Sequence, residues 1–312
     1  MRAFTLDRFD SSPGLREDLP TPRIGDDQLL IRVRASSVNP VDAFIASGIL
    51  RGMVEHEFPV VLGRDYAGVV EQAGAAVDRY AAGDAVFGFL PHANPTVHEG
   101  TWAELIVVPQ DQSVARQPAG VDMGQAGAAS LAGLTALAAH DALRLRQGAT
   151  VLVVGASGGV GSFAVQLAAA AGATVVAPGL AEDRGYLGGL GVAEVVDRDG
   201  DVAAAVRERH PGGVDALLDL ASSSPDALEA YAAVVREGGR VVSSVGAAGD
   251  GPGRVNVGAF PSPENLERLA GLLDAGALRV PIQATHPLAE AGQALKALTT
   301  QHTQGKIAIT VP

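Results

Sequence analysis

The stretch TVLVVGASGGVGSFAVQ, residues 150–166, joins an apolar run to a glycine-rich turn and the start of a helix. The apolar run at 151–154 is typical of a strand that is buried on both faces of a parallel sheet. In such a turn Gly158 permits close approach of the backbone to a pyrophosphate, and Gly161 lets the helix pack against the strand. The first amides of the helix attract the anion, so the stretch predicts a dinucleotide site. The predicted cofactor-binding residues of the turn are Ser157, Gly158, Gly159, Val160 and Gly161.

The turn departs at one position from the usual Gly-x-Gly-x-x-Gly fingerprint. Ala156 stands where the first glycine is expected, and Gly155 comes directly before it. An ordinary tight turn between a strand and a helix is the alternative interpretation. The strand before the turn and the helix after it are the context that the fingerprint requires, and they favour cofactor binding.

The next apolar run, residues 174–177, bears on the choice between NAD and NADP. NAD-dependent proteins usually end this strand with an acid that binds the ribose 2′-hydroxyl. Ala177 occupies that place here, and Arg184 offers a charged donor to a 2′-phosphate a few residues later. The acids Glu182 and Asp183 lie beside Arg184 and disfavour a phosphate there. The alternative is that Arg184 is a solvated residue at the start of a helix. We predict NADPH as the cofactor, with Arg184 as a phosphate ligand.

The rest of the chain predicts an α/β protein with two kinds of domain. Residues 1–120 contain short strand-like runs at 29–35, 66–74, 83–89 and 102–108, and their frequent glycine and proline favour a small β-rich, barrel-like domain. Over 121–260, helices (125–145, 159–171, 225–235) alternate with strands (150–154, 174–177, 215–220, 240–245), which indicates a doubly wound parallel sheet. Residues 261–312 are expected to complete the first domain, with an amphipathic helix at 263–275 and a returning strand at 305–311.

Composition argues against several classes of function. The formal net charge is −12 and no run is rich in Lys or Arg, so a nucleic-acid partner is not expected. The chain has no cysteine, which excludes thiolate nucleophiles and cysteine-containing zinc sites. The first residues lack the apolar run of a signal peptide, and the apolar stretch at 163–171 is too short to span a bilayer. We therefore expect a cytoplasmic protein without a membrane partner.

Five segments in this order resemble the medium-chain dehydrogenase/reductase superfamily, specifically its zinc-free quinone oxidoreductase (zeta-crystallin-like) branch. They are SVNPVD (37–42), PVVLGRDYAGVV (59–70), GDAV (83–86), LAGLTA (131–136) and the glycine turn at 155–161. The resemblance covers nearly the whole chain. It implies a GroES-like substrate domain, a Rossmann NADPH-binding domain and a cofactor cleft at their junction. It also implies a small-molecule substrate and a homo-oligomer, commonly a homodimer.

The same resemblance bears on metal binding. Metal-dependent relatives hold a catalytic zinc with Cys and His in these segments, whereas the matching positions here are Asn39 and Arg64. His92 and His98 lie six residues apart in the loop at 91–100, without a thiolate or a clear carboxylate partner. We expect no metal, and we interpret this loop as a flexible surface or lid segment.

The resemblance places Asn39 and Thr135 on the nicotinamide side of the site, as the predicted catalytic and cofactor-binding residues. Asn39 would donate a hydrogen bond to substrate or cofactor; alternatively, it serves only as a turn residue. Thr135 would contact the nicotinamide ring or its phosphate side; alternatively, it is a helix residue whose hydroxyl bonds back to a carbonyl. Asp42 is expected to anchor the local turn.

Three further residues complete the expected site. Gly246, after the strand at 240–245, would approach the nicotinamide amide, or would serve only its turn. Phe44 and Leu50 stand where relatives often carry tyrosines that approach the substrate, so they predict a more apolar pocket edge without a phenolic proton donor.

These features predict an NADPH-dependent enzyme that transfers a hydride to a quinone or an α,β-unsaturated carbonyl without a metal. A zinc-free ketone/alcohol or enoyl-thioester reductase of the same fold is one alternative. A non-catalytic NADPH-binding protein is another, because a fold does not by itself establish a function. Neither a nucleophile elbow nor a convincing general acid is found in the sequence.

Overall fold

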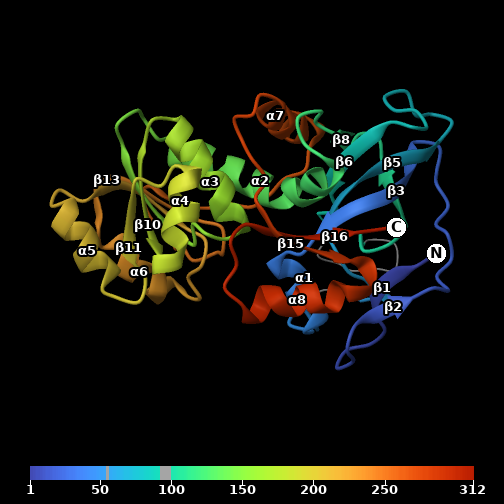
Figure 1. Ribbon diagram of the computed structural model, residues 1–312, viewed down its shortest axis with the longest axis horizontal. Helices are drawn as coiled ribbons and strands as arrows, with labels where there is room; N and C mark the ends of the chain where they lie inside the picture. Colours follow the sequence, from blue (N-terminus) through green and yellow to red (C-terminus); the bar gives the residue numbers. More distant parts are fainter. Residues whose placement is uncertain (54–55, 92–99) are drawn as a thin grey trace. The chain divides into compact units, whose positions relative to one another are not determined.

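The computed structural model describes residues 1–53, 56–91 and 100–312 (Figure 1). The chain forms two compact units. Residues 1–131, 260–276 and 282–312 make up the first unit, and residues 132–259 with 277–281 make up the second. The long helix α2 (Met123–Leu143) begins in the first unit and ends in the second.

The second unit is built on a six-stranded sheet in which all strands are parallel. The strand order is β11-β10-β9-β12-β13-β14, so the chain moves outward from β9 in one direction and then in the other. This is the 3-2-1-4-5-6 order of a dinucleotide-binding sheet, which binds its ligand outside the carboxyl ends of the strands. The strands are β9 (Thr150–Val154), β10 (Thr174–Gly179), β11 (Glu194–Asp197), β12 (Val214–Asp219), β13 (Val235–Ser243) and β14 (Arg254–Asn256).

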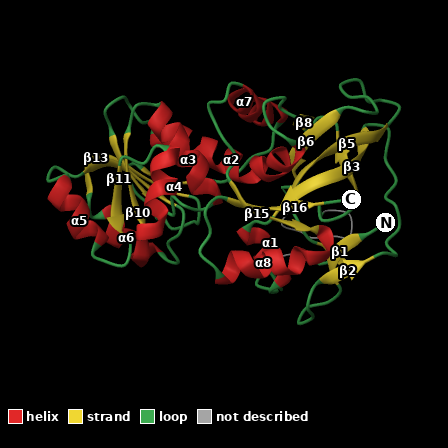
Figure 2. Ribbon diagram, in the orientation of Figure 1, coloured by secondary structure: helices red, strands yellow, loops and turns green. Residues whose placement is uncertain are grey.

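Helices cover both sides of this sheet (Figure 2). They are α3 (Gly159–Ala170), α4 (Arg184–Leu190), which follows the short helix η1 (Ala181–Asp183), α5 (Val202–Arg209) and α6 (Pro225–Ala232). Local signals begin the last two: Asp201 caps α5 through the amide of Ala204, and Ser224 caps α6 through the amide of Ala227. Apolar side chains of the strands and of α5 and α6 form one buried core.

The first unit contains a seven-stranded and a three-stranded sheet. In the larger sheet, antiparallel pairs join β3 to β5, β7 and β16, and a parallel pair joins β15 to β16. The strands of the larger sheet are β3 (Gln28–Ser37), β5 (Asp65–Ala73), β6 (Ala85–Phe89), β7 (Leu105–Pro109), β8 (Ala115–Arg116), β15 (Ile282–Pro287) and β16 (Lys306–Thr310). The smaller sheet has β1 (Ala3–Leu6), β2 (Gly14–Arg16) and β4 (Val60–Val61).

Helices α1 (Pro40–Ala46), α7 (Pro263–Asp274) and α8 (Ala291–Thr300), with the short helix η2 (Leu288–Glu290), complete the first unit. Pro263 stands at the first position of α7, and the Ser262 hydroxyl accepts from the amide of Asn265. The buried face of α7 carries Leu266, Leu269 and Leu273 at helical spacing, as the amphipathic pattern predicts.

The predicted α/β class, with a GroES-like β-rich part and a Rossmann part, is confirmed, and the returning strand β16 does pair with β3. The strand expected to begin at Trp102 begins instead at Leu105. Trp102 is fully buried, and its backbone pairs with Leu62 and Phe4 rather than with β3. No described helix is long and apolar enough to cross a membrane.

Candidate functional site

The glycine turn between β9 and α3 has the features of an anion site at a helix N-terminus. Val154 ends the buried strand, and Gly155 turns the chain with a φ of +85°, a conformation that favours glycine. Gly158 is the N-cap of α3 and supplies no side-chain cap. The first amides of this helix therefore have no side-chain acceptor of their own and are open to a negatively charged ligand.

The two other fingerprint glycines meet different surroundings. A Cβ on Gly161 would lie 2.2 Å from the carbonyl oxygen of Gly155, so only glycine lets α3 pack this closely on the turn. A Cβ on Gly158 would have the Gly155 oxygen at 3.6 Å as its nearest described neighbour, so this position has room. The space over Gly158 is what a pyrophosphate would need, and the turn fits the dinucleotide that the sequence predicts.

A cavity of about 380 Å³ lies in the second unit, at the carboxyl ends of β9 and β12. Its walls include Val154, Ala221 to Ser223 and the residues just after β11, among them Arg198. The Arg198 amide donates to the carbonyl of Gly179, the last residue of β10, at 3.2 Å. The acid of an NAD-binding protein would stand at the end of β10, and Arg198 stands just after the neighbouring strand β11.

Arg184, the arginine that the sequence singles out, lies elsewhere. It is exposed, begins α4 and is not among the described residues that line this cavity. Its neighbour Asp183 is fully buried and accepts from the amide of Leu180 at 2.9 Å, so that carboxylate holds the local turn. Sequence reasoning missed Arg198 because it follows a four-residue strand that was not predicted.

The loops after β12 and β13 are tied together at the same edge of the sheet. Asp219 is fully buried; Oδ1 accepts from the amide of Ser222 at 3.0 Å, and Oδ2 accepts from the Ser243 hydroxyl at 2.9 Å. The Ser243 oxygen accepts in turn from the amide of Ala247 at 3.2 Å. Gly246 lies in this loop with a φ of +79°, and a Cβ there would meet no described atom within 4 Å. The turn thus explains this glycine, and the space above it stays open.

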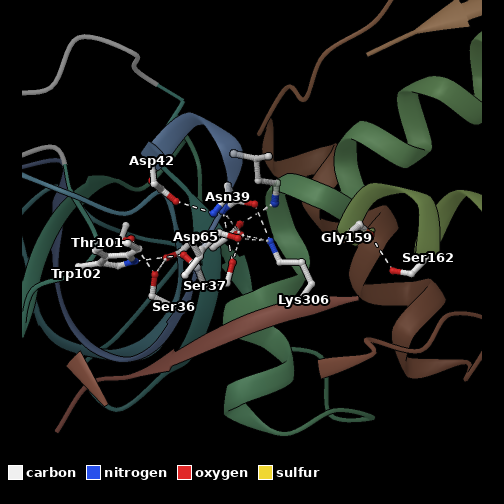
Figure 3. Close-up of polar contacts among 12 residues, drawn as sticks. Ser36, Ser37, Asn39, Asp42, Asp65, Thr101, Trp102, Gly159, Ser162 and Lys306 are labelled. Carbon is white, nitrogen blue, oxygen red and sulfur yellow. Dashed lines mark hydrogen bonds and ion pairs between the residues drawn. The ribbon is translucent and has the colours of Figure 1, made fainter. Parts of the chain in front are cut away.

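In the first unit, Asn39 belongs to a buried polar network (Figure 3). Its Oδ1 accepts from the Lys306 ammonium at 2.6 Å, and its Nδ2 donates to Asp65 Oδ2 at 2.9 Å and to Ser37 Oγ at 3.4 Å. Lys306 also lies 3.4 Å from Asp65 Oδ2. Asn39, Asp65 and Lys306 are at most 3% exposed, so this network is almost entirely removed from water.

Asp65 is the centre of the network. One carboxylate oxygen accepts from the Ser37 hydroxyl at 2.6 Å, and the other accepts from the backbone amide of Leu131 in α2 at 2.7 Å. The preceding residue, Arg64, is also buried. Charge-assisted hydrogen bonds of this kind are short and strong, and they offset the cost of burying the carboxylate. The network therefore fixes the orientation of the Asn39 amide.

Asp42, at the start of α1, is a fully buried carboxyl group beside this network. Its Oδ2 accepts from the backbone amide of Asn39 at 2.8 Å, which is the turn-anchoring role expected from the sequence. Its Oδ1 has no hydrogen-bond partner among the described residues. Burial raises the pKa of Asp42 to about 7, although the charges of Arg64 and Lys306 oppose the shift. The group therefore exchanges its proton near neutral pH.

The Asp42 shift makes a testable prediction about stability. Because the pKa of Asp42 is higher in the folded chain than in the unfolded chain, its contribution to stability is complete below about pH 4 and falls as pH rises through 7. Between pH 5.5 and 8 the loss is on the order of 2 kcal/mol. Asp42→Asn should remove this part of the pH dependence. Urea unfolding of both proteins at the two pH values measures it, and equal pH dependence would refute the assignment.

The remaining predicted residues are distributed over both units. Thr135 is buried in α2, 7% exposed. Phe44 lies on α1 with 48% of its surface exposed, whereas Leu50 is half-buried and packs against the core of the first unit. His92 and His98 fall outside the described residues. The roles of Thr135, Phe44 and Leu50 toward a ligand stay predictions.

Sequence reasoning did not find Lys306. The chain has two lysines, Lys296 and Lys306, and only the second is buried. It lies 267 residues from Asn39 in the sequence, so no local motif connects them. The one available signal was a lone charge in an otherwise apolar strand, since Lys306 begins β16 ahead of Ile307 and Ile309.

Comparison with known proteins identifies the family of this chain. Residues 25–119 match the alcohol dehydrogenase GroES-like domain, and residues 190–309 match a domain described as zinc-binding dehydrogenase. A chloroplastic quinone-oxidoreductase homolog of Spinacia oleracea is 30% identical, over 93% of this chain and 91% of the relative. The chain belongs to the medium-chain dehydrogenase/reductase superfamily. Within the superfamily it falls in the quinone oxidoreductase-like branch, as the five sequence segments indicate.

Two further relatives extend the comparison. The quinone oxidoreductase structure from Coxiella burnetii superposes with a TM-score of 0.88 at 29% identity, covering 100% of this chain and 99% of that one. A phthioceranic/hydroxyphthioceranic acid synthase of Mycobacterium tuberculosis is 32% identical over 92% of this chain but only 14% of its own length. The protein is an oxidoreductase on a fold that binds a nicotinamide dinucleotide.

The description of one matching domain as zinc-binding raises the question of a metal. The donor set here does not fit zinc, because the chain has no cysteine and the expected ligand positions hold an amide, Asn39, and a cation, Arg64. The Asn39 oxygen is already bonded to the Lys306 ammonium, a second positive charge. Among the described residues, no group of three His, Asp or Glu side chains could hold a metal ion.

Proposed function

We propose that the protein is an NADPH-dependent reductase that transfers a hydride to a quinone or an α,β-unsaturated carbonyl without a metal. The observation that carries the proposal is the uncapped, glycine-lined N-terminus of α3 at the switch point of the parallel sheet. The similarity to quinone oxidoreductases from plants and bacteria supports the class of acceptor. Asn39, Thr135, Gly246 and the turn residues Ser157 to Gly161 are its proposed site, with Phe44 and Leu50 at the substrate edge.

When bound, the reduced nicotinamide supplies the hydride, and the chain binds and orients the reactants. The turn at the start of α3 would hold the pyrophosphate through backbone amides. Asn39 would stabilise negative charge that develops on an acceptor oxygen. Its longest contact, 3.4 Å to the Ser37 hydroxyl, is the bond that a ligand would replace, while Lys306 and Asp65 keep the amide oriented.

The experiment that tests the proposal is a fluorescence titration with NADPH and NADH, followed by addition of quinone and enone acceptors with and without EDTA. We expect tight NADPH binding and NADPH oxidation that EDTA does not reduce. Absence of dinucleotide binding would refute the cofactor site. Loss of activity in EDTA that zinc restores would refute the metal-free reaction.

A pair of variants tests the preference for NADPH. Arg198 lines the cavity at the strand ends and Arg184 does not, so Arg198→Ala is expected to weaken NADPH binding about tenfold or more and to leave NADH binding within about twofold. Arg184→Ala should have the smaller effect. The readout is the ratio of the two dissociation constants, measured for each variant. If only Arg184→Ala changes the ratio, the original sequence prediction holds and Arg198 is not the phosphate ligand.

A second candidate within the same fold is a ketone/alcohol or enoyl-thioester reductase. The exposed Phe44 and the match to a mycobacterial acid synthase support this second candidate. Turnover of an enoyl thioester at a higher kcat/KM than any quinone would select it. Tight NADPH binding without oxidation by any quinone, enone, ketone or thioester would instead favour a non-catalytic NADPH-binding protein.

The proposal includes a homodimer that acts in the cytoplasm. Val245, 47% exposed in the second unit, and Phe260, 72% exposed in the first, are large apolar side chains of the kind that interfaces cover. Light scattering of the purified protein gives its mass in solution, and cell fractionation gives its location. A monomer across the micromolar range would refute the dimer.

A further inference from the structure

The second unit has a second cavity, of about 520 Å³, at the opposite end of its strands. It is lined by the 143–149 loop between α2 and β9, by Asp215 and Ala216 at the start of β12, and by the first half of β13. All strands of this sheet are parallel, so their amino ends lie together and away from the glycine turn. The cavity is therefore separate from the proposed dinucleotide site.

The lining of this cavity has an unusual charge for an acidic protein. It contains four arginines, Arg144, Arg146, Arg236 and Arg240, and Asp215 is the only acid among the described residues that line it. The chain as a whole has a formal charge of −12. We call this feature the arginine cavity.

Two of these arginines are held in place by short hydrogen bonds. Arg236 Nε donates to Asp215 Oδ1 at 2.7 Å, and Asp215 Oδ2 accepts from the amide of Thr150 at 2.7 Å. Arg240 Nε donates to the carbonyl of Ala142, in the last turn of α2, at 2.6 Å. Each of these guanidinium groups uses its Nε–H in this way and keeps further N–H groups for other acceptors.

The side chains of the other two arginines have no partner among the residues that the structure describes. The side chains of Arg144 and Arg146 make no hydrogen bond and no ion pair with the described part of the chain. Arg144 also adopts a φ of +50°, the left-handed region that glycine usually fills after a helix end. An arginine is thus present where local backbone geometry favours glycine.

The charges do not cancel within the cavity. Asp215 neutralises one arginine, and the C-terminus of α2 contributes about half a negative charge. Between two and three positive charges are left, which a doubly or triply charged anion would neutralise. Planar guanidinium groups match phosphate oxygens in pairs, and they are the usual partners of phosphate in proteins.

We propose that the arginine cavity binds a small phosphate-bearing anion of two or more charges, at a site distinct from the dinucleotide turn. Asp215 and the end of α2 orient Arg236 and Arg240, while Arg144 and Arg146 supply the unneutralised charge. Gly148 and Gly238 lie in turns at its border. A Cβ added at either position would have no described atom within 4 Å, so both glycines leave the entrance open.

The test is calorimetric titration of the full-length protein with inorganic diphosphate. The Gly158→Asp background prevents diphosphate from binding at the glycine turn, so the result does not depend on the proposed NADPH site. We expect saturable binding with a dissociation constant below ~1 mM that weakens as salt is added. The double variant Arg144→Gly/Arg146→Ala should weaken it at least about tenfold.

Controls separate a site from a general charge effect. Arg144→Gly suits the left-handed backbone, so the double variant should keep the wild-type unfolding midpoint. Arg8→Ala/Arg23→Ala removes the same charge from two exposed positions in the first unit and should leave diphosphate binding unchanged. Binding that both double variants weaken equally, or no saturation up to ~10 mM, would overturn the proposal. Tighter binding of a polyglutamate peptide than of diphosphate would also overturn it.

Discussion

Gly158→Asp should reduce the affinity for NADPH and NADH by at least about 100-fold while the protein stays folded. Gly158 has a φ of −74° and a ψ of −177°, an extended conformation open to any residue, and a Cβ there has 3.6 Å of space to its nearest described neighbour. The new carboxylate would lie at the N-terminus of α3, where the pyrophosphate is proposed to bind. At an effective dielectric constant near 20, two unit charges about 4 Å apart repel by about 4 kcal/mol.

The same substitution should act on stability in the opposite direction. Asp is a preferred N-cap residue, and α3 has no side-chain cap in the wild-type protein. The variant should therefore be at least as stable as the wild type, by up to about 1 kcal/mol. Loss of binding together with equal or higher stability cannot result from misfolding.

Two matched variants isolate the charge. Gly158→Ala adds only a Cβ to an open position, and Gly158→Asn adds a neutral capping group of the same size as Asp. We expect affinity to decrease in the order Gly, Ala, Asn, Asp, with the largest step at the charge. Dissociation constants from fluorescence titration and midpoints from urea unfolding provide both readouts. Wild-type dinucleotide affinity in Gly158→Asp would remove this turn from the site.

The glycine turn could be predicted from the sequence because its constraint is local. Gly161 must be glycine since any Cβ would collide with the Gly155 carbonyl six residues earlier, and Gly155 must be glycine because of its positive φ. Strand β9 and helix α3 on either side are mostly apolar, so their patterns are clear. Where sequence neighbours determine the geometry, the prediction and the structure agree.

Elements stabilised by distant contacts were missed. Helix α4 contains Gly185, Gly188 and Gly189, which lower its helix propensity, yet Leu187 and Leu190 are buried and hold it in place. Strands β11 and β14 have only four and three residues, too few to show a period. The buried network could not be predicted from the sequence for the same reason, because Asn39, Asp65 and Lys306 come from three separate segments. Only the fold brings these charges together.

Lys306→Met should destabilise the protein by about 3–5 kcal/mol. The substitution keeps the apolar length of the side chain and removes the ammonium, which leaves the fully buried Asp65 carboxylate without its ion-pair partner. Asn39 Oδ1 would also lose the donor that lies 2.6 Å from it. Removing one member of a buried charged pair costs far more than a surface contact, because the remaining charge stays out of water.

The chain's other lysine provides the matched control. Lys296 is exposed on α8, so Lys296→Met should change the free energy of unfolding by less than about 0.5 kcal/mol. Adding Asp65→Asn to Lys306→Met should recover part of the loss, because the unpaired carboxylate is then absent. A double-mutant cycle in urea gives the coupling energy directly, and a value near zero would show that the pair does not act as a unit.

A second readout connects this cluster to Asp42. The positive charge of Lys306 lowers the pKa of Asp42, against the larger effect of burial that raises it. Lys306→Met should therefore raise the Asp42 pKa further, so that the Asp42-dependent loss of stability continues to a higher pH and is larger in total than in the wild type. Subtracting the curve of the corresponding Asp42→Asn variant isolates this contribution. An unchanged curve would mean that the two groups do not interact, and the network would then end at Asn39 and Asp65.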